Sequence, residues 1–295
     1  MKIIVSGSLG HISKPLTEEL VKKGHAVTVV SSNPEKQKDI EALGANAAIG
    51  SLEDADFLAS TFAGADSAYC MTPPSYAEPD QVSYFRRIAN NYASAIQQSG
   101  VKRVVLLSSY GADLDKGTGL ILGAHNAEDI LSELQGLGLT LLRPGYFYYN
   151  LYNFTGMIKH AGIIGSNYGG DDKLLLVAPA DIASAIAEEL TNTINGTAVR
   201  YVASDERTCN EVAQVLGAAI GKPGLQWTTF SDDQTQQGML QQGMPAGFVE
   251  GMVELGAALR KGILQNDYLL HKPATLGKVK LEDFAKEFAV AFNKE

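Results

Sequence analysis

Residues 1–12 read Met-Lys-Ile-Ile-Val-Ser-Gly-Ser-Leu-Gly-His-Ile, and this stretch decides the fold. An apolar run at residues 3–5 predicts a short buried strand, and Gly7 and Gly10 follow it directly before a helical pattern. A strand, a glycine turn and a helix N-terminus in this order present backbone N–H groups to a diphosphate. The glycines permit positive φ angles and a close approach of the backbone to phosphate. The stretch predicts a dinucleotide site, with Ser13 where a third glycine would complete the usual spacing.

Apolar strands and helical stretches alternate through the first half of the chain, a pattern typical of a doubly wound parallel sheet. The run Val101 to Ser108 is continuously apolar at its centre, which predicts a strand buried on both faces. We therefore expect an α/β Rossmann-type fold with a smaller, mostly helical C-terminal lobe. Residues 1–150 are expected to form the dinucleotide-binding domain and residues 151–295 the substrate-binding lobe, with shared elements and no clear linker. Further strands are expected at 26–30, 45–49, 67–71 and 139–142, and helices at 81–99, 126–134, 181–190 and 281–292.

Composition bounds the class of protein. A net charge of −9 over 295 residues argues against nucleic acid as the main partner, because phosphate binding requires a basic surface. Cys70 and Cys209 lie far apart and suit a reducing compartment. The sequence has neither a signal-peptide pattern nor an apolar run long enough to span a bilayer. We expect a soluble cytoplasmic protein that acts on a small molecule.

The second predicted strand ends in Ser31, Ser32 and Asn33, where the adenosine ribose would lie. An acidic residue there favours a free 2′-hydroxyl, and an arginine favours a 2′-phosphate. This chain has neither, so its hydroxyls, the Asn33 amide and Lys36 could hold a phosphate that no carboxylate repels. The alternative is an ordinary helix N-cap at Asn33 beside a solvated lysine. NADP is the expected cofactor, with NAD as the alternative.

Residues at the ends of the fourth and fifth predicted strands are candidates for the nicotinamide half of the cofactor. Met71, Thr72 and Pro73 follow the fourth strand, and Ser108 ends the fifth, at the sheet edge where open α/β folds bind ligands. Cys70 is expected to be a small buried apolar residue, since a free cysteine is more often buried than nucleophilic.

Ser109 and His125 are candidate catalytic residues, because a hydroxyl can polarise a carbonyl and imidazole transfers protons near neutral pH. The alternatives are a turn hydroxyl and a helix-start residue that points into solvent. Glu128, Asp129 and Glu133 spread around their helix and are expected on a solvated face. The five histidines show no metal-ligand spacing.

An aromatic cluster follows the sixth predicted strand, and Tyr146 and Phe147 lie closest to that strand. Such residues either pack as a core between the sheet and the lobe or form the apolar wall of a site for a flat organic substrate. Tyr146 is therefore a third candidate at the reaction site.

Several segments together resemble one family. Gly7-Ser8-Leu9-Gly10-His11-Ile12, Asn33-Pro34-Glu35-Lys36, Val101-Lys102-Arg103-Val104-Val105 and Leu142-Arg143-Pro144-Gly145 carry the likeness. In their order and spacing they are similar to the NmrA-like proteins of the atypical short-chain dehydrogenase/reductase superfamily. The resemblance covers about the first 190 residues well and the C-terminal lobe loosely. It implies an NAD(P)H-binding protein related to quinone reductases and to nucleoside-diphosphate-sugar epimerases.

Departures from the family pattern shape the expected chemistry. The family usually carries threonine at the place of Leu9, glycine at that of Ser13 and arginine at that of Ser32. The superfamily's catalytic Tyr-x-x-x-Lys falls at Ile121 and His125, and isoleucine donates no proton. NmrA-like quinone reductases also carry histidine at the second place. The resemblance therefore implies direct hydride delivery to the acceptor, with a proton from His125 or water.

These observations lead to one leading hypothesis and three alternatives. We expect an NAD(P)H-dependent oxidoreductase that reduces a small quinone- or enone-like acceptor. The alternatives are a non-catalytic redox sensor that binds NAD(P) and passes its state to a protein partner, a sugar-nucleotide epimerase-like enzyme, and a family member that has lost cofactor binding, which the altered turn at Leu9 and Ser13 would favour. The expected catalytic residues are His125, Ser109 and Tyr146. The expected cofactor contacts are Gly7, Ser8, Leu9, Gly10, His11, Ile12, Ser31, Ser32, Asn33, Met71, Thr72, Pro73 and Ser108.

Overall fold

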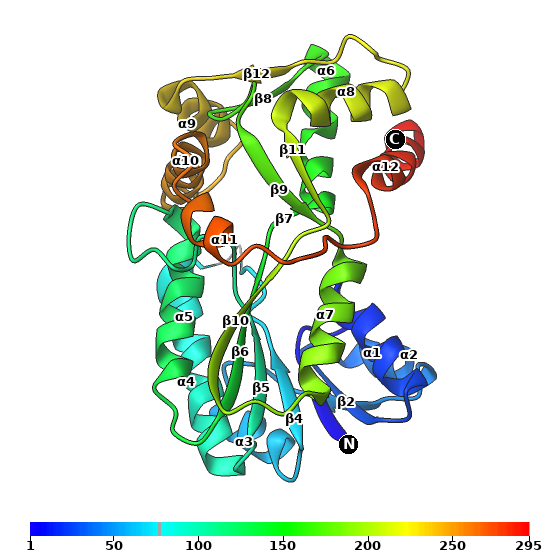
Figure 1. Cartoon of the computed structure of the whole chain (residues 1–295), viewed down its shortest axis with the longest axis vertical. Helices are drawn as coiled ribbons and strands as arrows, with labels where there is room; N and C mark the ends of the chain where they lie inside the picture. Colours follow the sequence, from blue (N-terminus) through cyan, green and yellow to red (C-terminus); the bar gives the residue numbers. More distant parts are fainter. Residues whose placement is uncertain (76–77, 295) are drawn as a thin grey trace.

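A seven-stranded parallel sheet forms the centre of the computed structural model, which describes residues 1–75 and 78–294 (Figure 1). Its strand order is β10-β6-β5-β4-β1-β2-β3, so the order reverses between β1 and β4 as in a doubly wound sheet. The predicted Rossmann-type fold is confirmed. The strands are β1 (Lys2–Val5), β2 (Ala26–Ser31), β3 (Asn46–Ile49), β4 (Ser67–Cys70), β5 (Arg103–Leu107), β6 (Gly138–Pro144) and β10 (Gly196–Val202).

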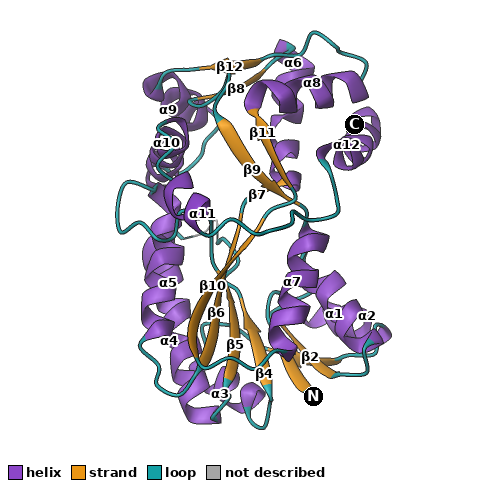
Figure 2. Ribbon diagram, in the orientation of Figure 1, coloured by secondary structure: helices purple, strands orange, loops and turns teal. Residues whose placement is uncertain are grey.

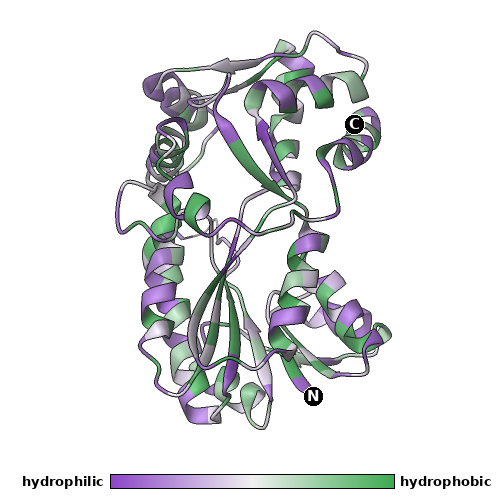
Figure 3. Cartoon of the chain, in the orientation of Figure 1, coloured by the Kyte–Doolittle hydropathy of each residue, from purple (hydrophilic) through white to green (hydrophobic). Residues whose placement is uncertain are grey.

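Helices cover both faces of this sheet (Figure 2). The central strands β4, β5 and β6 are buried on both sides, as predicted for β5, where Val104 packs into one core cluster and Val105 into the other. Helices α1 and α7 pack together over one face, and α3, α4 and α5 cover the opposite face. Figure 3 shows apolar residues on the central strands and mixed polar and apolar turns along the covering helices. The elements are α1 (Ser13–Lys22), η1 (Pro34–Lys36), α2 (Gln37–Ala42), α3 (Ala55–Phe62), α4 (Gln81–Ser99), η2 (Gly119–Ile121), α5 (Leu122–Ser132) and α7 (Pro179–Thr191).

The remaining elements form a lobe over the carboxyl ends of the central strands (Figure 1). Strand β6 leads directly into β7, and β10 leads into β11, so the chain passes from the sheet into the lobe twice. Its core is aromatic and includes Trp227, Phe284 and Phe288. The lobe holds β7 (Tyr146–Phe147), η3 (Tyr148–Phe154), α6 (Thr155–Ala161), β8 (Ile164–Ser166), β9 (Lys173–Val177), β11 (Asp205–Thr208), α8 (Cys209–Ala219), β12 (Trp227–Thr229), α9 (Asp232–Gln241), α10 (Ala246–Arg260), α11 (Gln265–Leu270) and α12 (Leu281–Lys294).

Two features of the arrangement bear on the site. Helix α7 and strand β10 lie beyond residue 150 and yet complete the central sheet, so residues 151–295 are shared between the sheet and the lobe. Helix α5 begins at Leu122, four residues before the predicted start at residue 126, which places His125 inside the helix. None of the helices in residues 1–75 and 78–294 combines the length and apolar character that a membrane span requires.

Candidate functional site

The glycine turn between β1 and α1 has a shape that only small residues allow. Gly7 has a φ of +91°, and a Cβ added there would lie 2.7 Å from Ser13 Oγ and 2.9 Å from Met71 Sδ. Ser8 also has a positive φ, 55°, and the Gly10 N–H donates to the Gly7 carbonyl over 3.2 Å. The turn is therefore closed tightly, with the end of β4 directly behind it.

Ser13, at the place of the third glycine, is buried and satisfied. Its hydroxyl donates to the Ser6 carbonyl over 2.8 Å, which ties the first turn of α1 to the end of β1. The close helix–strand packing that a glycine would permit is thus retained with a hydroxyl that has its own acceptor.

The N-terminus of α1 offers donors to an anion. No side chain caps the helix at Ile12. Within the part of the chain that the structure describes, the backbone N–H groups of His11, Ile12 and Ser13 meet no acceptor. Unpaired N–H groups at a helix N-terminus, together with the helix dipole, favour a phosphate. The residues of the turn therefore fit the diphosphate of a dinucleotide.

The end of β2 lies beside this turn. Ser31 is buried, and its hydroxyl accepts hydrogen bonds from the Ser8 hydroxyl over 2.9 Å and from the Asn33 N–H over 3.2 Å. The Asn33 side chain accepts a hydrogen bond from the Glu35 N–H over 2.9 Å. Asn33 is therefore the N-cap of η1, which is one of the two alternatives that the sequence predicts for it. Ser32 is exposed. The structure thus brings Ser8, Ser31 and Asn33 together.

The end of β4 closes the other side of the turn. The Met71 N–H donates to the Ser6 hydroxyl over 2.8 Å, and the Tyr92 hydroxyl donates to the Met71 carbonyl over 2.7 Å. Thr72 and Pro73 follow at the sheet edge, half-buried. Cys70 is fully buried, as predicted, and burial raises the pKa of its thiol far above the ordinary value. It is therefore a packing residue and no nucleophile.

Ser108, at the end of β5, belongs to a buried polar network. Its hydroxyl donates to Glu128 Oε1 on α5. Arg143, on β6, donates to the same carboxylate through Nε over 2.9 Å and Nη2 over 2.6 Å. Arg143 Nη1 also donates to Asp267 on α11 over 2.9 Å and to the Tyr201 hydroxyl on β10 over 3.2 Å. The network ties three sheet strands to α5 and to the lobe.

Glu128 is buried, contrary to the solvated face that its helical spacing with Asp129 and Glu133 predicts. Its side chain is 4% exposed and paired with Arg143. Helical spacing could not reveal this, because the partner lies on a different element. Arg143 could have indicated the pair, because an arginine within an otherwise apolar, buried strand predicts a buried carboxylate nearby.

The three predicted catalytic residues do not converge. The Ser109 hydroxyl donates to the Tyr110 carbonyl over 3.1 Å. His125 Nδ1 lies 2.9 Å from the Ala112 carbonyl and so carries the proton there, while Nε2 lies 3.3 Å from the exposed Asp129 carboxylate. Ile121, at the place of the superfamily's tyrosine, is buried.

Tyr146 faces the interior of the lobe. Its ring packs against the aromatic core cluster, and burial raises its pKa to about 12, although a hydrogen bond with the Tyr168 hydroxyl partly opposes the shift. Its neighbours on η3 and β7 lie closer to the glycine turn. Tyr149 stacks on the His11 ring with centroids 4.6 Å apart, and Phe147 lies 5.2 Å from Tyr149. The aromatic cluster therefore divides between a packed core and a surface beside the turn.

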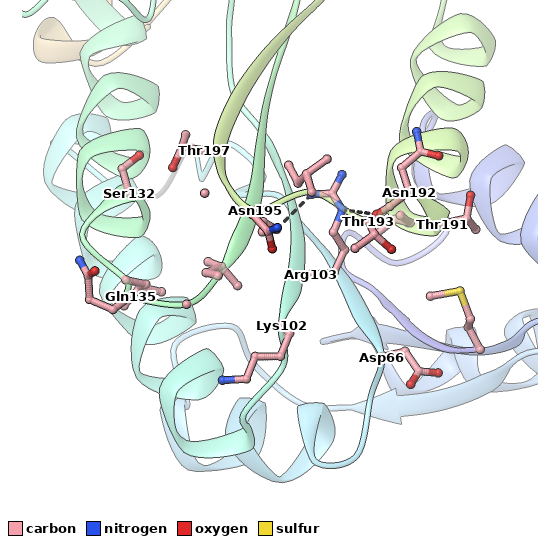
Figure 4. A pocket seen from close by; sticks show the side chains of 18 residues that line it. Asp66, Lys102, Arg103, Ser132, Gln135, Thr191, Asn192, Thr193, Asn195 and Thr197 are labelled. Carbon is pink, nitrogen blue, oxygen red and sulfur yellow. Dashed lines mark hydrogen bonds between the residues drawn. The ribbon is translucent and has the colours of Figure 1, made fainter.

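A pocket of about 620 Å³ lies at the opposite, amino edge of the sheet (Figure 4). Its lining includes Met1, Lys102, Arg103, Asn195 and Thr197, and none of the predicted site residues. Open α/β sheets bind their ligands at the carboxyl edge, so this pocket is separate from the candidate site.

Comparison with known proteins agrees with this geometry. A family described as NAD(P)H-binding matches residues 7–193. An NAD(P)H azoreductase from Xenophilus azovorans is 27% identical over 299 residues, which cover 98% of this chain and 99% of the relative. An NADPH-dependent quinone oxidoreductase from Escherichia coli, solved with NADPH, superimposes with a TM-score of 0.81 at 23% identity over 97% of this chain and 99% of that one. A triphenylmethane reductase from Citrobacter sp. gives a TM-score of 0.79 at 21% identity over 98% and 100% of the two chains.

Proposed function

The chain belongs to the NAD(P)H-binding family, and from that premise we propose that it is an NAD(P)H-dependent oxidoreductase that reduces a flat, electrophilic small molecule such as a quinone. The observation that carries the proposal is the glycine turn at the carboxyl edge of the sheet. Gly7 lies against Met71 there, and the backbone N–H groups of residues 11–13 have no acceptor among the described residues. The azoreductase that matches nearly the whole chain supports an acceptor of the same planar kind.

The chain's own residues would bind and orient, while the bound cofactor supplies the hydride. The turn from Gly7 to Ile12 would hold the diphosphate, and Met71, Thr72 and Ser108 would border the nicotinamide. Reduction of a quinone takes up one hydride and one proton. Because isoleucine stands at position 121, the proton would come from water or from His125.

The molecule that accepts the hydride would lie against Phe147 and Tyr149. Both are half-buried aromatic residues beside the glycine turn, and such rings present the flat apolar surface on which a planar ring system packs. Ser109 and Tyr146 are retained as candidate contacts on the lobe side. The hydroxyl of Tyr146 is bound to Tyr168, so we expect it to shape the wall rather than to transfer a proton.

We further propose that NADP(H) is preferred over NAD(H). The three residues at the ribose position are neutral, and no carboxylate among them would repel a 2′-phosphate. Ser32 is exposed there, whereas the Ser31 hydroxyl is already occupied. We also propose a cytoplasmic location, because Cys70 and Cys209 are both buried, unpaired thiols that suit a reducing compartment.

The test mixes the purified protein with NADPH or NADH and a panel of quinones, an azo dye and a cationic triphenylmethane dye. Oxidation of the cofactor is followed by its near-ultraviolet absorbance, against a reaction without protein. We expect turnover with at least one planar acceptor and a lower KM for NADPH than for NADH. Cofactor binding without turnover on any acceptor would refute the proposal.

A redox sensor is the second candidate, because Ile121 removes the side chain on which tyrosine-based reduction depends. For this function, calorimetry would find that the oxidised and reduced cofactors bind with different affinities, and the panel would find no turnover.

A further inference from the structure

The donors and acceptors around Ser108 fix the direction of its hydroxyl. Arginine has N–H donors and no acceptor, so Arg143 requires Glu128 as a carboxylate that only accepts. The Ser108 hydroxyl has one proton and directs it to Glu128 Oε1. The Ser108 backbone N–H is also used, because it donates to the Leu142 carbonyl over 2.8 Å. The side chain therefore presents only oxygen lone pairs to a ligand at the sheet edge.

The Glu128 carboxylate is held firmly in this orientation. Arg143 contacts it through two nitrogens, and its third nitrogen is bound by Asp267 on α11. Tyr201 donates to the same Asp267 oxygen over 2.6 Å while it accepts from Arg143. Bidentate arginine–carboxylate pairs fix geometry as well as charge. The acceptor character of Ser108 is thus set by a network that reaches from the sheet into the lobe.

The place of Ser108 indicates which part of a dinucleotide it meets. The diphosphate turn follows β1, the ribose position follows β2, and Ser108 lies on the other side of the switch point, at the end of β5. The nicotinamide half of the cofactor therefore extends toward Ser108. Its carboxamide carries an NH₂ group, the donor that an acceptor-only hydroxyl recognises.

We propose that Ser108 accepts a hydrogen bond from the carboxamide NH₂ of the nicotinamide, and that Glu128, held by Arg143, is the positioning residue that makes Ser108 an acceptor. This inference rests on the proposed function, because it requires an NAD(P) cofactor. It assigns a role to a buried ion pair that would otherwise be read as structural only.

The test compares the dissociation constants of NADP⁺ and of its 3-acetylpyridine analogue, which carries a methyl group in place of the NH₂. Titration calorimetry measures both for the wild-type protein, Ser108→Ala and Glu128→Gln. Ser108→Ala removes the acceptor and leaves the Glu128–Arg143 pair in place. In Glu128→Gln, a single amide oxygen remains for three donors, which are the Ser108 hydroxyl and two nitrogens of Arg143. The glutamine therefore no longer fixes the direction of the Ser108 hydroxyl.

Glu189→Gln is the matched control. Glu189 accepts from buried Arg103 over 2.8 Å and from the Thr140 hydroxyl over 2.9 Å, so it is also a carboxylate shared by an arginine and a hydroxyl. Arg103 lies at the amino edge of the sheet, in the view of Figure 4, remote from the proposed site. The control therefore reproduces the loss of stability that follows when a buried ion pair is disturbed, and it leaves the surroundings of Ser108 unchanged.

The wild-type protein and Glu189→Gln should bind NADP⁺ about tenfold more tightly than the analogue, the effect of one well-placed hydrogen bond. Ser108→Ala and Glu128→Gln should bring this ratio close to one. If Glu128→Gln does not fold, Ser108→Ala alone decides the acceptor role. Tight NADP⁺ binding with an unchanged ratio in Ser108→Ala overturns the inference and leaves the proposed function standing. Absence of NADP⁺ binding by the wild-type protein overturns both.

Discussion

Replacing Gly7 by alanine separates the two roles of the glycine turn, backbone conformation and cofactor binding. The φ of +91° strains any residue with a Cβ, at a cost of about 1–2 kcal/mol. The new Cβ would also lie 2.7 Å from Ser13 Oγ, whose hydrogen bond to Ser6 is buried. Displacing that hydroxyl from its acceptor costs a further 1–3 kcal/mol or so. We expect Gly7→Ala to lower the free energy of unfolding by about 2–5 kcal/mol.

The assay is thermal unfolding followed by circular dichroism, with and without NADP⁺. A ligand at one hundred times its dissociation constant stabilises the folded protein by about 2.7 kcal/mol, and the wild-type protein should show this increase in Tm. The Tm of Gly7→Ala should be several degrees below that of the wild-type protein. Addition of NADP⁺ should not raise the Tm of this variant, because its diphosphate site is distorted.

Gly24→Ala is the matched control. Gly24 has a similar φ of +82°, but a Cβ added there meets nothing within 4 Å. This variant should lose only the conformational part, about 1–2 kcal/mol, and keep the full response to NADP⁺. If Gly7→Ala is no less stable than Gly24→Ala and responds equally to NADP⁺, the turn at Gly7 is neither closely packed nor part of the cofactor site.

Three further predictions test other parts of the structure. Glu189→Ala leaves Arg103 buried without its carboxylate and should lower the free energy of unfolding by about 3–5 kcal/mol in denaturant titration, with the Kd for NADP⁺ unchanged. A hydrogen bond from Arg260 lowers the pKa of Asp232, so its contribution to stability is present at neutral pH and lost as the pH falls through that lowered value. Asp232→Asn should therefore be less stable than wild type at neutral pH, and the difference in the free energy of unfolding should shrink as the pH falls below the ordinary aspartate range, as measured by denaturant unfolding over a series of pH values. Ser32→Asp places a carboxylate at the ribose position and should raise the ratio of the Kd for NADP⁺ to that for NAD⁺ about fivefold or more in calorimetric titration, and an unchanged ratio would contradict the proposed 2′-phosphate site.

Local patterns in the sequence were sufficient to predict the central sheet and the position of the glycine turn. The glycine turn, the strand alternation and the Asn33 cap depend on residues a few positions apart, and each was confirmed at its predicted place. The capping box at Thr208 and Glu211, another local motif, also begins a helix. Propensity and spacing describe such contacts well because their partners are neighbours in the chain.

Contacts between distant residues escaped the sequence analysis. Glu128 and Arg143 are 15 residues apart on a helix and a strand, and Asp267 joins them from 124 residues beyond Arg143. The strands of the lobe are also short, and their pairing joins segments such as Ile164–Ser166 and Trp227–Thr229. No period in the sequence encodes these pairings, because tertiary packing alone brings the partners together.

Hydride transfer from a bound nicotinamide to a quinone can be measured in a stopped-flow, single-turnover experiment with NADPH deuterated at either face of C4, followed by the cofactor absorbance. If the protein holds the nicotinamide in one orientation and directs the hydride to the quinone, deuterium on one face slows the decay and deuterium on the other face does not. Equal rates with both isotopomers, or no decay despite bound NADPH, would mean that the protein does not direct this transfer.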